Sequence, residues 1–569
     1  MKIILIMLSV LPVLTLAGDQ WTQWSGDQRN HHNMTPTRPL ISKENVANLK
    51  PVWISKVETS VVDTPTVEGG KIYFTDIAKI GVSGLFSGGH LYAAEAASGK
   101  ILWREDVKNY TKVGVRNFSR NSPAISGDLL VLGDSLNNLK FIVRELTSLR
   151  TIPGTSVMAV NRHTGKLVWK TKVEDHFASR ITMSPIIFDG KVLVGVSSIE
   201  SEIPAVRGQL YKCCNFKGSF VALDLATGKI LWKTPMISGD AIANSGAPVW
   251  GNSPPIDVKR NRVYVGSGNN YHVPKALQDC YMKGMLKDQT KEDEILKDCT
   301  SRFDSDENRF DSMVALDLTT GKIVWSLKTN IYDAWNVGCG SKFTSIPRRN
   351  ERICPKPEGV DGDFAQAPML ISTTEGDILV AGKKDGAILA VRAEDGKLLW
   401  KKQIGPGGKL GGHQWGSATD GKTIFFQTTN LEHHEITLEA GVEKGKVIRG
   451  GFWGALDALT GELKWQTADP ATKYPLLGEG LNHVIYGRNL GRGYFAAPMG
   501  PLTYYNGLIF AGSLSGLMVA MDANDGKILW SHQAKGSVVT APSVVNDQLF
   551  WGSGYHMGFQ DDKLYSFGL

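Results

Sequence analysis

A short motif that ends in tryptophan recurs along this chain and constrains its fold more than any other feature. Each copy has an alternating apolar stretch, a turn of the T-G-K or D-G-K kind and a second apolar stretch, as in "FVALDLATGKILW". Glycine supplies the positive φ that such a turn requires, so each copy predicts an antiparallel pair of strands. The seven copies end at Trp103, Trp169, Trp232, Trp325, Trp400, Trp465 and Trp530.

Most copies are preceded by a second pair of short apolar stretches, such as "SPAISGDLLVLGDS" or "SPIIFDGKVLVGVSS". Four antiparallel strands in each repeat are typical of a propeller blade. A β-solenoid is the alternative architecture, but its repeats are usually far shorter than these, which mostly lie about 65 residues apart.

The two ends of the chain complement each other. The segment "NLKPVWISK" contains Trp53 without a preceding hairpin, whereas "TAPSVVNDQLFWGSGY" supplies inner strands without a final tryptophan strand. Joining them removes the open sheet edges. We therefore predict an all-β fold over residues 19–569, an eight-bladed β-propeller of four-stranded antiparallel blades closed by the N- and C-terminal strands. Residues 272–312, with helical periodicity, and 337–364 exceed blade length and are predicted excursions on one face.

Composition narrows the class of protein. The chain is 42% hydrophobic and its net charge of +7 is spread over 569 residues, which excludes disorder and makes nucleic acid a poor partner. Residues 1–18 combine one lysine, an apolar run and small residues, and they are predicted to be a signal peptide; an uncleaved anchor is the alternative. No other stretch is apolar enough to span a bilayer. The expected location is secreted, or periplasmic in a bacterium.

Export to an oxidising compartment agrees with the six cysteines. Pairing by proximity gives Cys213–Cys214, Cys280–Cys299 and Cys339–Cys354, although sequence cannot prove the connectivity. Three N-x-S/T sequences, at Asn33, Asn109 and Asn117, would permit glycosylation in a eukaryotic host.

The A-x-D-x-x-T-G-K-x-x-W hairpins resemble those of the pyrroloquinoline quinone (PQQ) dehydrogenases. The segments "CCNFKGSFVALDLATGK", "DAWNVGCG" and "GGHQWGSATDG" are closer to the polyvinyl-alcohol dehydrogenase branch. The resemblance covers essentially the whole mature chain. It implies an alcohol dehydrogenase that holds PQQ and calcium in the central funnel.

The resemblance also nominates site residues. The residues implied for cofactor binding are Arg120, Thr182 and Ser197 for the PQQ carboxylates, Trp250 under the ring, Lys384 at the quinone oxygens and the pair Cys213–Cys214 above the ring. The implied calcium ligands are Glu200 and Asn269. These residue types suit PQQ and calcium, because the PQQ carboxylates need cationic and hydroxyl donors, its flat ring needs flat surfaces, and calcium takes oxygen ligands.

Three departures from the family pattern matter. The family's usual base follows the tryptophan of a D-x-W-D segment, and this chain has Asn336 there, which cannot accept the proton. Asp333 is therefore the predicted base or an additional calcium ligand. The vicinal cysteines of methanol dehydrogenase come one blade earlier, whereas here they follow Glu200. Val62 replaces a glutamate that contacts PQQ, with Asp63 beside it.

Two functions remain open at this stage. The first is a secreted quinoprotein that oxidises the hydroxyls of alcohols or polyols, including polymeric ones. Because the chain has no C-x-x-C-H haem motif, its electrons would pass to a separate acceptor. The second is a catalytically inactive propeller that serves as an extracellular binding or matrix protein. A blade-stacking assembly factor of the bacterial outer membrane is a weaker third reading, because those proteins are shorter and lack the vicinal pair.

Overall fold

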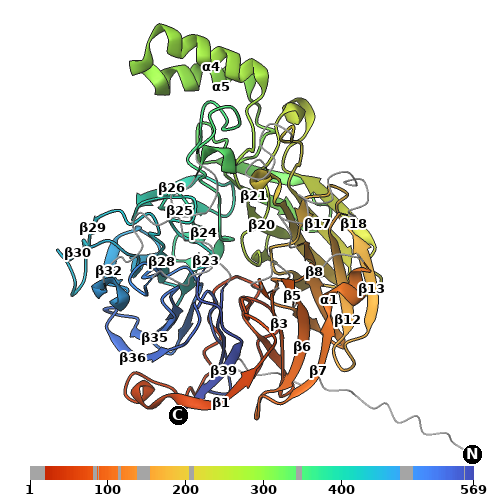
Figure 1. Ribbon diagram of the computed structural model, residues 1–569, viewed down its shortest axis with the longest axis vertical. Coiled ribbons are helices and arrows are strands. Elements are labelled where there is room, and N and C mark those ends of the chain that lie inside the picture. Colours follow the sequence, from red (N-terminus) through yellow and green to blue (C-terminus); the bar gives the residue numbers. More distant parts are fainter. Residues whose placement is uncertain are drawn as a thin grey trace, which may run out of the picture.

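Eight four-stranded antiparallel sheets form a ring in the computed structural model (Figure 1). The structure describes residues 19–77, 79–80, 86–87, 89–112, 117–136, 154–203, 211–340, 349–474, 491–555 and 558–569. The predicted signal peptide, residues 1–18, lies outside them. No helix in these ranges is long and apolar enough to cross a bilayer.

The strands of each blade follow one another from the axis outward. Blades 1 to 4 consist of β2 (Thr66–Glu68), β3 (Lys71–Thr75), β6 (His90–Glu95) and β7 (Ile101–Asp106); β9 (Ala124–Ser126), β10 (Leu129–Gly133), β12 (Ser156–Asn161) and β13 (Leu167–Lys172); β15 (Ile186–Phe188), β16 (Lys191–Ser198), β17 (Ser219–Asp224) and β18 (Ile230–Pro235), with β14 (Ser179–Arg180) also on β16; and β19 (Ile256–Asp257), β20 (Arg262–Gly266), β21 (Ser312–Asp317) and β22 (Ile323–Lys328).

The second half of the ring repeats this order. Blades 5 to 8 consist of β23 (Met369–Thr373), β24 (Gly376–Gly382), β25 (Ala387–Arg392) and β26 (Leu398–Gln403); β27 (Ala418–Thr419), β28 (Thr423–Thr428), β31 (Phe452–Asp457) and β32 (Leu463–Ala468); β33 (Leu502–Tyr505), β34 (Leu508–Gly512), β35 (Leu517–Asp522) and β36 (Ile528–Gln533); and β37 (Ser543–Val545), β38 (Gln548–Gly552), β39 (Lys563–Gly568) and β1 (Lys50–Lys56).

The eighth blade closes the ring as the sequence predicts, because the N-terminal strand β1 pairs antiparallel with the C-terminal strand β39. The prediction of an eight-bladed propeller is confirmed. All three disulfides also form between the predicted partners, Cys213–Cys214, Cys280–Cys299 and Cys339–Cys354.

The repeat tryptophans join neighbouring blades. The indole Nε1 of Trp103, for example, donates to the carbonyl oxygen of Arg162 in the next blade's turn at 3.0 Å. Trp53, Trp169, Trp325, Trp400, Trp465 and Trp530 make the equivalent bond. Most of these indole rings also pack on the turn glycine of the next blade. A Cβ on Gly228, for example, would lie 2.5 Å from the Trp169 ring. Glycine is thus required for close approach as well as for its φ of +71°.

Short elements decorate this ring. The two-stranded sheets are β4 (Lys79–Ile80) with β5 (Phe86–Ser87), β8 (Asn117–Phe118) with β11 (Ser135–Leu136), and β29 (Ile436–Thr437) with β30 (Val447–Ile448). The helical turns are η1 (Val46–Asn48), α1 (Val107–Thr111), η3 (Glu200–Glu202), η5 (Gly239–Ala243), η6 (Gln289–Lys291), η7 (Val337–Cys339) and η8 (Pro470–Lys473).

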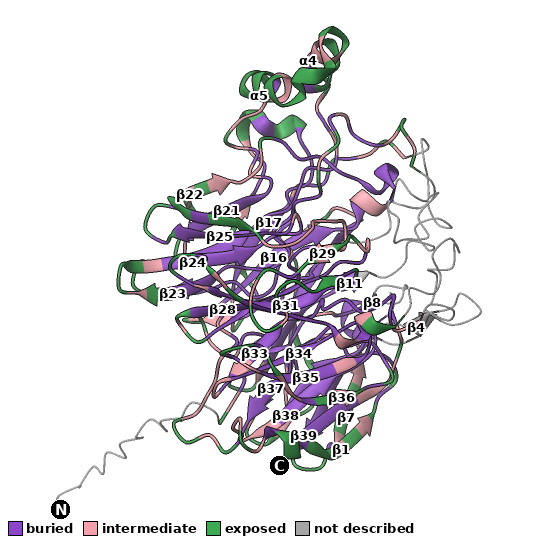
Figure 2. Cartoon of the chain, turned by 90° about the vertical axis from the view of Figure 1, so that its left-hand side faces the viewer, coloured by how far each residue is buried: buried purple, intermediate pink, exposed green. Residues whose placement is uncertain are grey.

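Two helices form the first predicted excursion. They are α4 (Lys275–Lys287) and α5 (Glu292–Phe303), joined by the Cys280–Cys299 disulfide. Figure 2 shows them projecting from the propeller, largely exposed, while the blade strands are mostly buried.

An N-terminal stretch, residues 21–33, passes around the centre of the ring from blade to blade and is called the axial segment here. Its carbonyl oxygens accept backbone hydrogen bonds from the innermost strands of blades 1, 2, 4, 5, 6 and 7. The donors are the N–H groups of Val67, Ile125, Ile256, Leu370, Thr419 and Tyr504, at 2.7 to 3.0 Å. The axial segment therefore satisfies inner strand edges that a ring of blades leaves open toward its centre.

Of the three N-x-S/T sequences, only Asn109 is exposed. The amide of Asn33 donates to the carbonyl oxygen of Thr419, and that of Asn117 donates to buried Asp134.

Candidate functional site

The predicted site residues lie at one face of the propeller. In each blade the first strand starts, and the antiparallel second strand ends, on the same face. Arg120, Thr182 and Trp250 precede the first strands of blades 2, 3 and 4. Glu200 and Lys384 follow the second strands of blades 3 and 5, and Asn269 likewise follows β20 in blade 4.

A cavity on the axis collects residues from blades around the ring, and we call it the axial cavity. It is lined by Trp24, Val62, Asp63, Thr64, Arg120, Thr182, Ser184, Asn252, Trp415, Pro501, Val539 and Thr540. Two predicted PQQ-carboxylate ligands, Arg120 and Thr182, are thus brought together. The hydroxyl of Thr182 lies 3.1 Å from that of Ser197, the third predicted ligand. Burial lowers the pKa of Arg120 below its usual range.

Two indoles extend this wall. The Arg120 guanidinium lies 4.7 Å from the ring centre of Trp415, and Trp415 meets Trp250 edge-on at 5.6 Å. The ammonium of Lys384 lies 5.9 Å from the Trp250 ring centre. A continuous series of cation, indole, indole and cation therefore connects Arg120 to Lys384. Trp415 lies within the segment "GGHQWGSATDG", but the family resemblance assigns it no role.

Asp363 joins three of the nominated residues and was also missed. Its Oδ2 accepts from the indole Nε1 of Trp250 at 3.1 Å and lies 3.4 Å from the ammonium of Lys384. Its Oδ1 accepts the backbone N–H of Asn269 at 2.6 Å. No motif marks this aspartate, because it comes at the end of the second excursion.

Lys384 is held charged by two carboxylates. Asp361 lies 2.7 Å from its ammonium, closer than Asp363. Burial acts to lower the pKa of Lys384, but these carboxylates outweigh it and raise the pKa above the usual value. Burial raises the pKa of Asp361 to about 8, although Lys384 opposes the rise.

Asp333, the predicted base, lies beneath the turn that carries Asp361. It is fully buried, and its carboxylate accepts the backbone N–H groups of Asp361 at 3.3 Å and Gly362 at 2.6 Å. Burial and the neighbouring carboxyl of Asp311 raise its pKa well above the ordinary value. In this arrangement Asp333 supports the turn.

Asn336 has a local structural reason to be an amide. Its Nδ2 donates to the carbonyl oxygens of Tyr271 at 3.1 Å and Ile353 at 3.0 Å, and its Oδ1 accepts the N–H of Gly338 at 2.8 Å. A carboxylate would face two carbonyl oxygens without a proton to donate.

The fit to a flat anionic cofactor differs from the fit to a metal. Arg120 and Thr182 supply donors for carboxylates, and the two indoles supply flat surfaces. Of the two predicted calcium ligands, Glu200 is the one whose oxygens already accept hydrogen bonds. The carboxylate of Glu200 is occupied by protein donors, and the amide nitrogen of Asn269 donates to Asn270 and Trp335 carbonyls. Among the described residues, three ligand atoms of acidic, histidine or cysteine side chains lie within 4.8 Å of one another only at two places, and both are disulfides with a neighbouring carboxylate.

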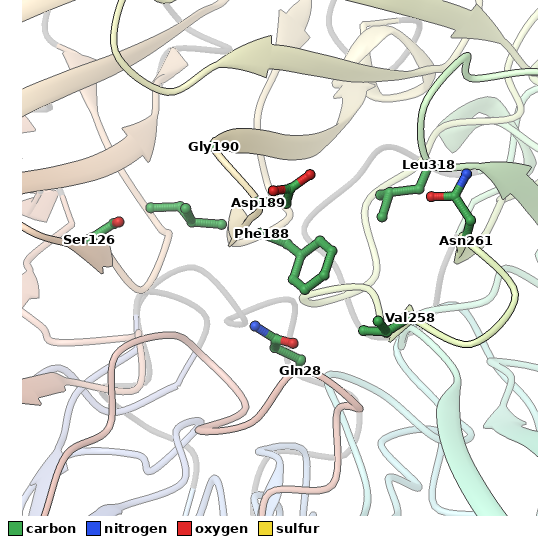
Figure 3. Close-up of a pocket in the computed structure, with 9 residues that line it drawn as sticks. Gln28, Ser126, Phe188, Asp189, Gly190, Val258, Asn261 and Leu318 are labelled. Carbon is green, nitrogen blue, oxygen red and sulfur yellow. The ribbon is translucent and has the colours of Figure 1, made fainter. Parts of the chain in front are cut away.

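A second pocket, of about 550 Å³, lies where the turns of blades 2, 3 and 4 meet the axial segment. Figure 3 shows Gln28, Phe188, Asp189 and Asn261 around it. None of the predicted site residues lines this pocket, and its turns belong to the opposite face of the blades.

The chain resembles known proteins both in sequence and in fold. The PQQ_2 sequence family, described as "Outer membrane protein assembly factor BamB", matches residues 38–198, 307–490 and 451–566. The chain is 26% identical to a polyvinylalcohol dehydrogenase of Pseudomonas sp, over 96% of this chain and 74% of the relative. It is 27% identical to the polyvinylalcohol dehydrogenase of Sphingopyxis sp. strain 113P3, over 94% and 70%.

Solved structures of low sequence identity share the fold. Quinohemoprotein alcohol dehydrogenase ADHIIG of Pseudomonas putida HK5 superposes with a TM-score of 0.64 at 17% identity, over 97% of this chain and 80% of that one. A europium-containing methanol dehydrogenase gives a TM-score of 0.62 at 16% identity, over 97% and 98%.

Proposed function

The chain belongs to the PQQ_2 family, and from this premise we propose that it is a quinoprotein oxidoreductase that oxidises alcohol hydroxyls with PQQ. One observation carries the proposal: the series Arg120, Trp415, Trp250 and Lys384 offers a cation at each end and flat surfaces between. PQQ is a planar ring with carboxylates and an ortho-quinone, so its charge and its flat faces suit the cations and indoles of this series. The alcohol dehydrogenases among the curated relatives support the same class of reaction.

Bound PQQ would supply the quinone that accepts a hydride equivalent from the alcohol. Arg120 and Thr182, with Ser197 behind Thr182, would bind its carboxylates through charge-assisted hydrogen bonds. Trp250 and Trp415 would hold the ring by contact with its faces and edges. The Lys384 ammonium would stabilise negative charge that develops on the quinone oxygens.

A carboxylate must take the hydroxyl proton of the alcohol. Asp333 is the base that the sequence predicts, but its oxygens face the backbone of the turn above it. Asp361 lies on that turn and touches Lys384. We therefore assign proton acceptance to Asp361, in its ionised form above its pKa of about 8, and support of the turn to Asp333.

Other parts of the proposal rest on the relatives and the sequence. The names of the relatives favour secondary hydroxyls of a polymer as substrate. Secretion or a periplasmic location, calcium as a second component and a separate electron acceptor remain predictions, and no step above depends on calcium.

The test uses the purified full-length protein. PQQ is added with and without calcium, and quinone absorbance and dye reduction are followed with ethanol, 2-propanol and polyvinyl alcohol. We expect saturable PQQ binding and alcohol-dependent dye reduction, and binding at least tenfold weaker in Arg120→Gln. Binding without turnover would indicate an inactive relative that holds its ligand. Absence of PQQ binding would refute the proposal and favour the extracellular binding or matrix protein.

A further inference from the structure

The carboxylate of Glu200 binds the loop that carries the vicinal cysteines. Glu200 follows β16, and its side chain is completely buried. Its Oε1 accepts the Tyr211 hydroxyl at 2.6 Å and the N–H of Asn215 at 3.0 Å. Its Oε2 accepts the same Asn215 N–H at 3.1 Å and the N–H of Phe216 at 2.8 Å. These two amides directly follow Cys213–Cys214.

A histidine completes the surroundings of this carboxylate. His176 Nε2 lies 3.5 Å from Glu200 Oε1 and 2.9 Å from the Asn215 side-chain oxygen. Both oxygens of Glu200 are therefore already engaged by groups of the protein itself.

The cysteine loop is also fixed on its other side. Cys214 and Phe216 belong to the apolar core between blades 2 and 3, together with Val196 and Tyr271. The Phe216 ring stacks on Tyr271 with 6.3 Å between centres and meets His176 edge-on at 5.5 Å. The loop is thus held in two ways: Glu200 binds it through hydrogen bonds, and the apolar core holds it by packing.

We propose that Glu200 is a positioning residue that anchors the Cys213–Cys214 loop and is not a metal ligand. A carboxylate offers about four lone-pair directions, and the donors from Tyr211, Asn215 and Phe216, with His176 beside them, account for these. A cation would have to displace hydrogen bonds to a buried backbone, which are costly to leave unmade. Only the cofactor-binding part of the test rests on the proposed function.

Hydrogen exchange of the protein without cofactor tests the anchor directly. In Glu200→Gln, one acceptor oxygen becomes an NH₂ group that faces backbone donors. We expect peptides covering residues 211–218 to exchange at least about tenfold faster than in the wild type. Glu202→Gln is the matched control, because Glu202 pairs with Arg180 at 3.2 Å and forms no hydrogen bond or ion pair with the described part of the loop. Unchanged exchange in Glu200→Gln would overturn the proposal.

Calcium addition and metal analysis distinguish an anchor from a ligand. If Glu200 is an anchor, calcium leaves the exchange of residues 211–218 in the wild type unchanged, and Glu200→Gln retains the wild-type metal content. Faster exchange on adding calcium, or loss of metal in Glu200→Gln alone, would show that the carboxylate is a ligand.

A double-mutant cycle tests whether Glu200 acts through the cysteines. We expect Glu200→Gln to weaken PQQ binding in the wild-type background and to have little further effect when Cys213→Ser and Cys214→Ser are present. An equal loss in both backgrounds would overturn the positioning role. If the wild type binds no PQQ, the proposed function fails, while the exchange experiment still decides on the anchor.

Discussion

Two aspartates separated by one backbone turn are expected to have different roles. Asp361→Asn removes the carboxylate that touches Lys384, so turnover should fall roughly 10²- to 10⁴-fold while PQQ absorbance on titration persists. Asp333→Asn places an NH₂ group against one of the two backbone donors, so it should lower the free energy of unfolding by about 1–3 kcal/mol. Steady-state kinetics and urea unfolding measure the two effects.

Asp385→Asn is the matched control for Asp361, because Asp385 pairs with the adjacent Lys383 at 2.8 Å. It should retain most of the turnover. If Asp333→Asn abolishes turnover in a protein of normal stability and Asp361→Asn does not, the assignment of the base is wrong.

Asp63 predicts a pH dependence of stability. Burial raises its pKa to about 8, although Thr75 donates to its Oδ2 from the backbone at 2.9 Å and the hydroxyl at 3.0 Å. The folded protein keeps this proton up to about pH 8, whereas the unfolded chain releases it near pH 4. The contribution of Asp63 to stability is therefore full below about pH 4 and is lost as the pH rises through 8.

Urea unfolding between pH 5 and pH 9 checks this expectation. The free energy of unfolding of Asp63→Asn should fall less over this range than that of the wild type. Parallel curves would contradict it. Since Asp63 lines the axial cavity with Arg120, its ionisation should also weaken PQQ binding above pH 8.

The sequence predicted residues of the axial cavity where a local motif carried them. Arg120 and Thr182 precede recognisable inner strands, and both line the axial cavity. Asp363 and Trp415 escaped because their partners come from other blades, so no spacing within the chain marks them. The motif nominated Glu200, but its bonds to Asn215 and Phe216 join positions 15 and 16 residues apart, which no local pattern records.

At the scale of elements, the tryptophans between blades allow a bonded indole N–H to be compared with one that has no bond in the described part of the chain. Trp103→Phe removes the indole bond to Arg162 but keeps an aromatic ring, so it should lower the free energy of unfolding by about 1 kcal/mol beyond the loss of packing. Trp232 has a buried Nε1 without a partner among the described residues. Trp232→Phe is therefore the control and should lower the free energy of unfolding by less than Trp103→Phe. An equal or larger decrease would contradict a stabilising role for the bond.

Hairpins and the helical excursion were predictable for the same reason. Each T-G-K turn is determined by local sequence, because a glycine with positive φ lies between two strands that pair with each other. Helices α4 and α5 likewise show their period within one continuous stretch. The axial segment has no such signal, because it contacts six inner strands through backbone groups that no side-chain pattern records.

At the scale of the molecule, closure has two independent components. Pairing of β1 with β39 joins the ring at its circumference, and the axial segment joins blades at the centre. The segment also buries Trp21 completely and leaves Trp24 5% exposed. The centre should therefore contribute to stability independently of the strand closure.

A chain that begins at residue 36 should be much less stable than one that begins at residue 19. Each buried tryptophan lost is worth about 3–5 kcal/mol, so we expect a loss above about 5 kcal/mol in urea unfolding. If the shortened chain does not fold, Trp24→Ala tests the same point, because Trp24 packs on His32 with 3.9 Å between ring centres and lines the axial cavity. That variant should lower the unfolding midpoint and weaken PQQ binding together, since one side chain supports both the centre of the ring and the wall of the cavity. A change in stability with unaltered affinity would show that the axial segment holds the ring without shaping the site.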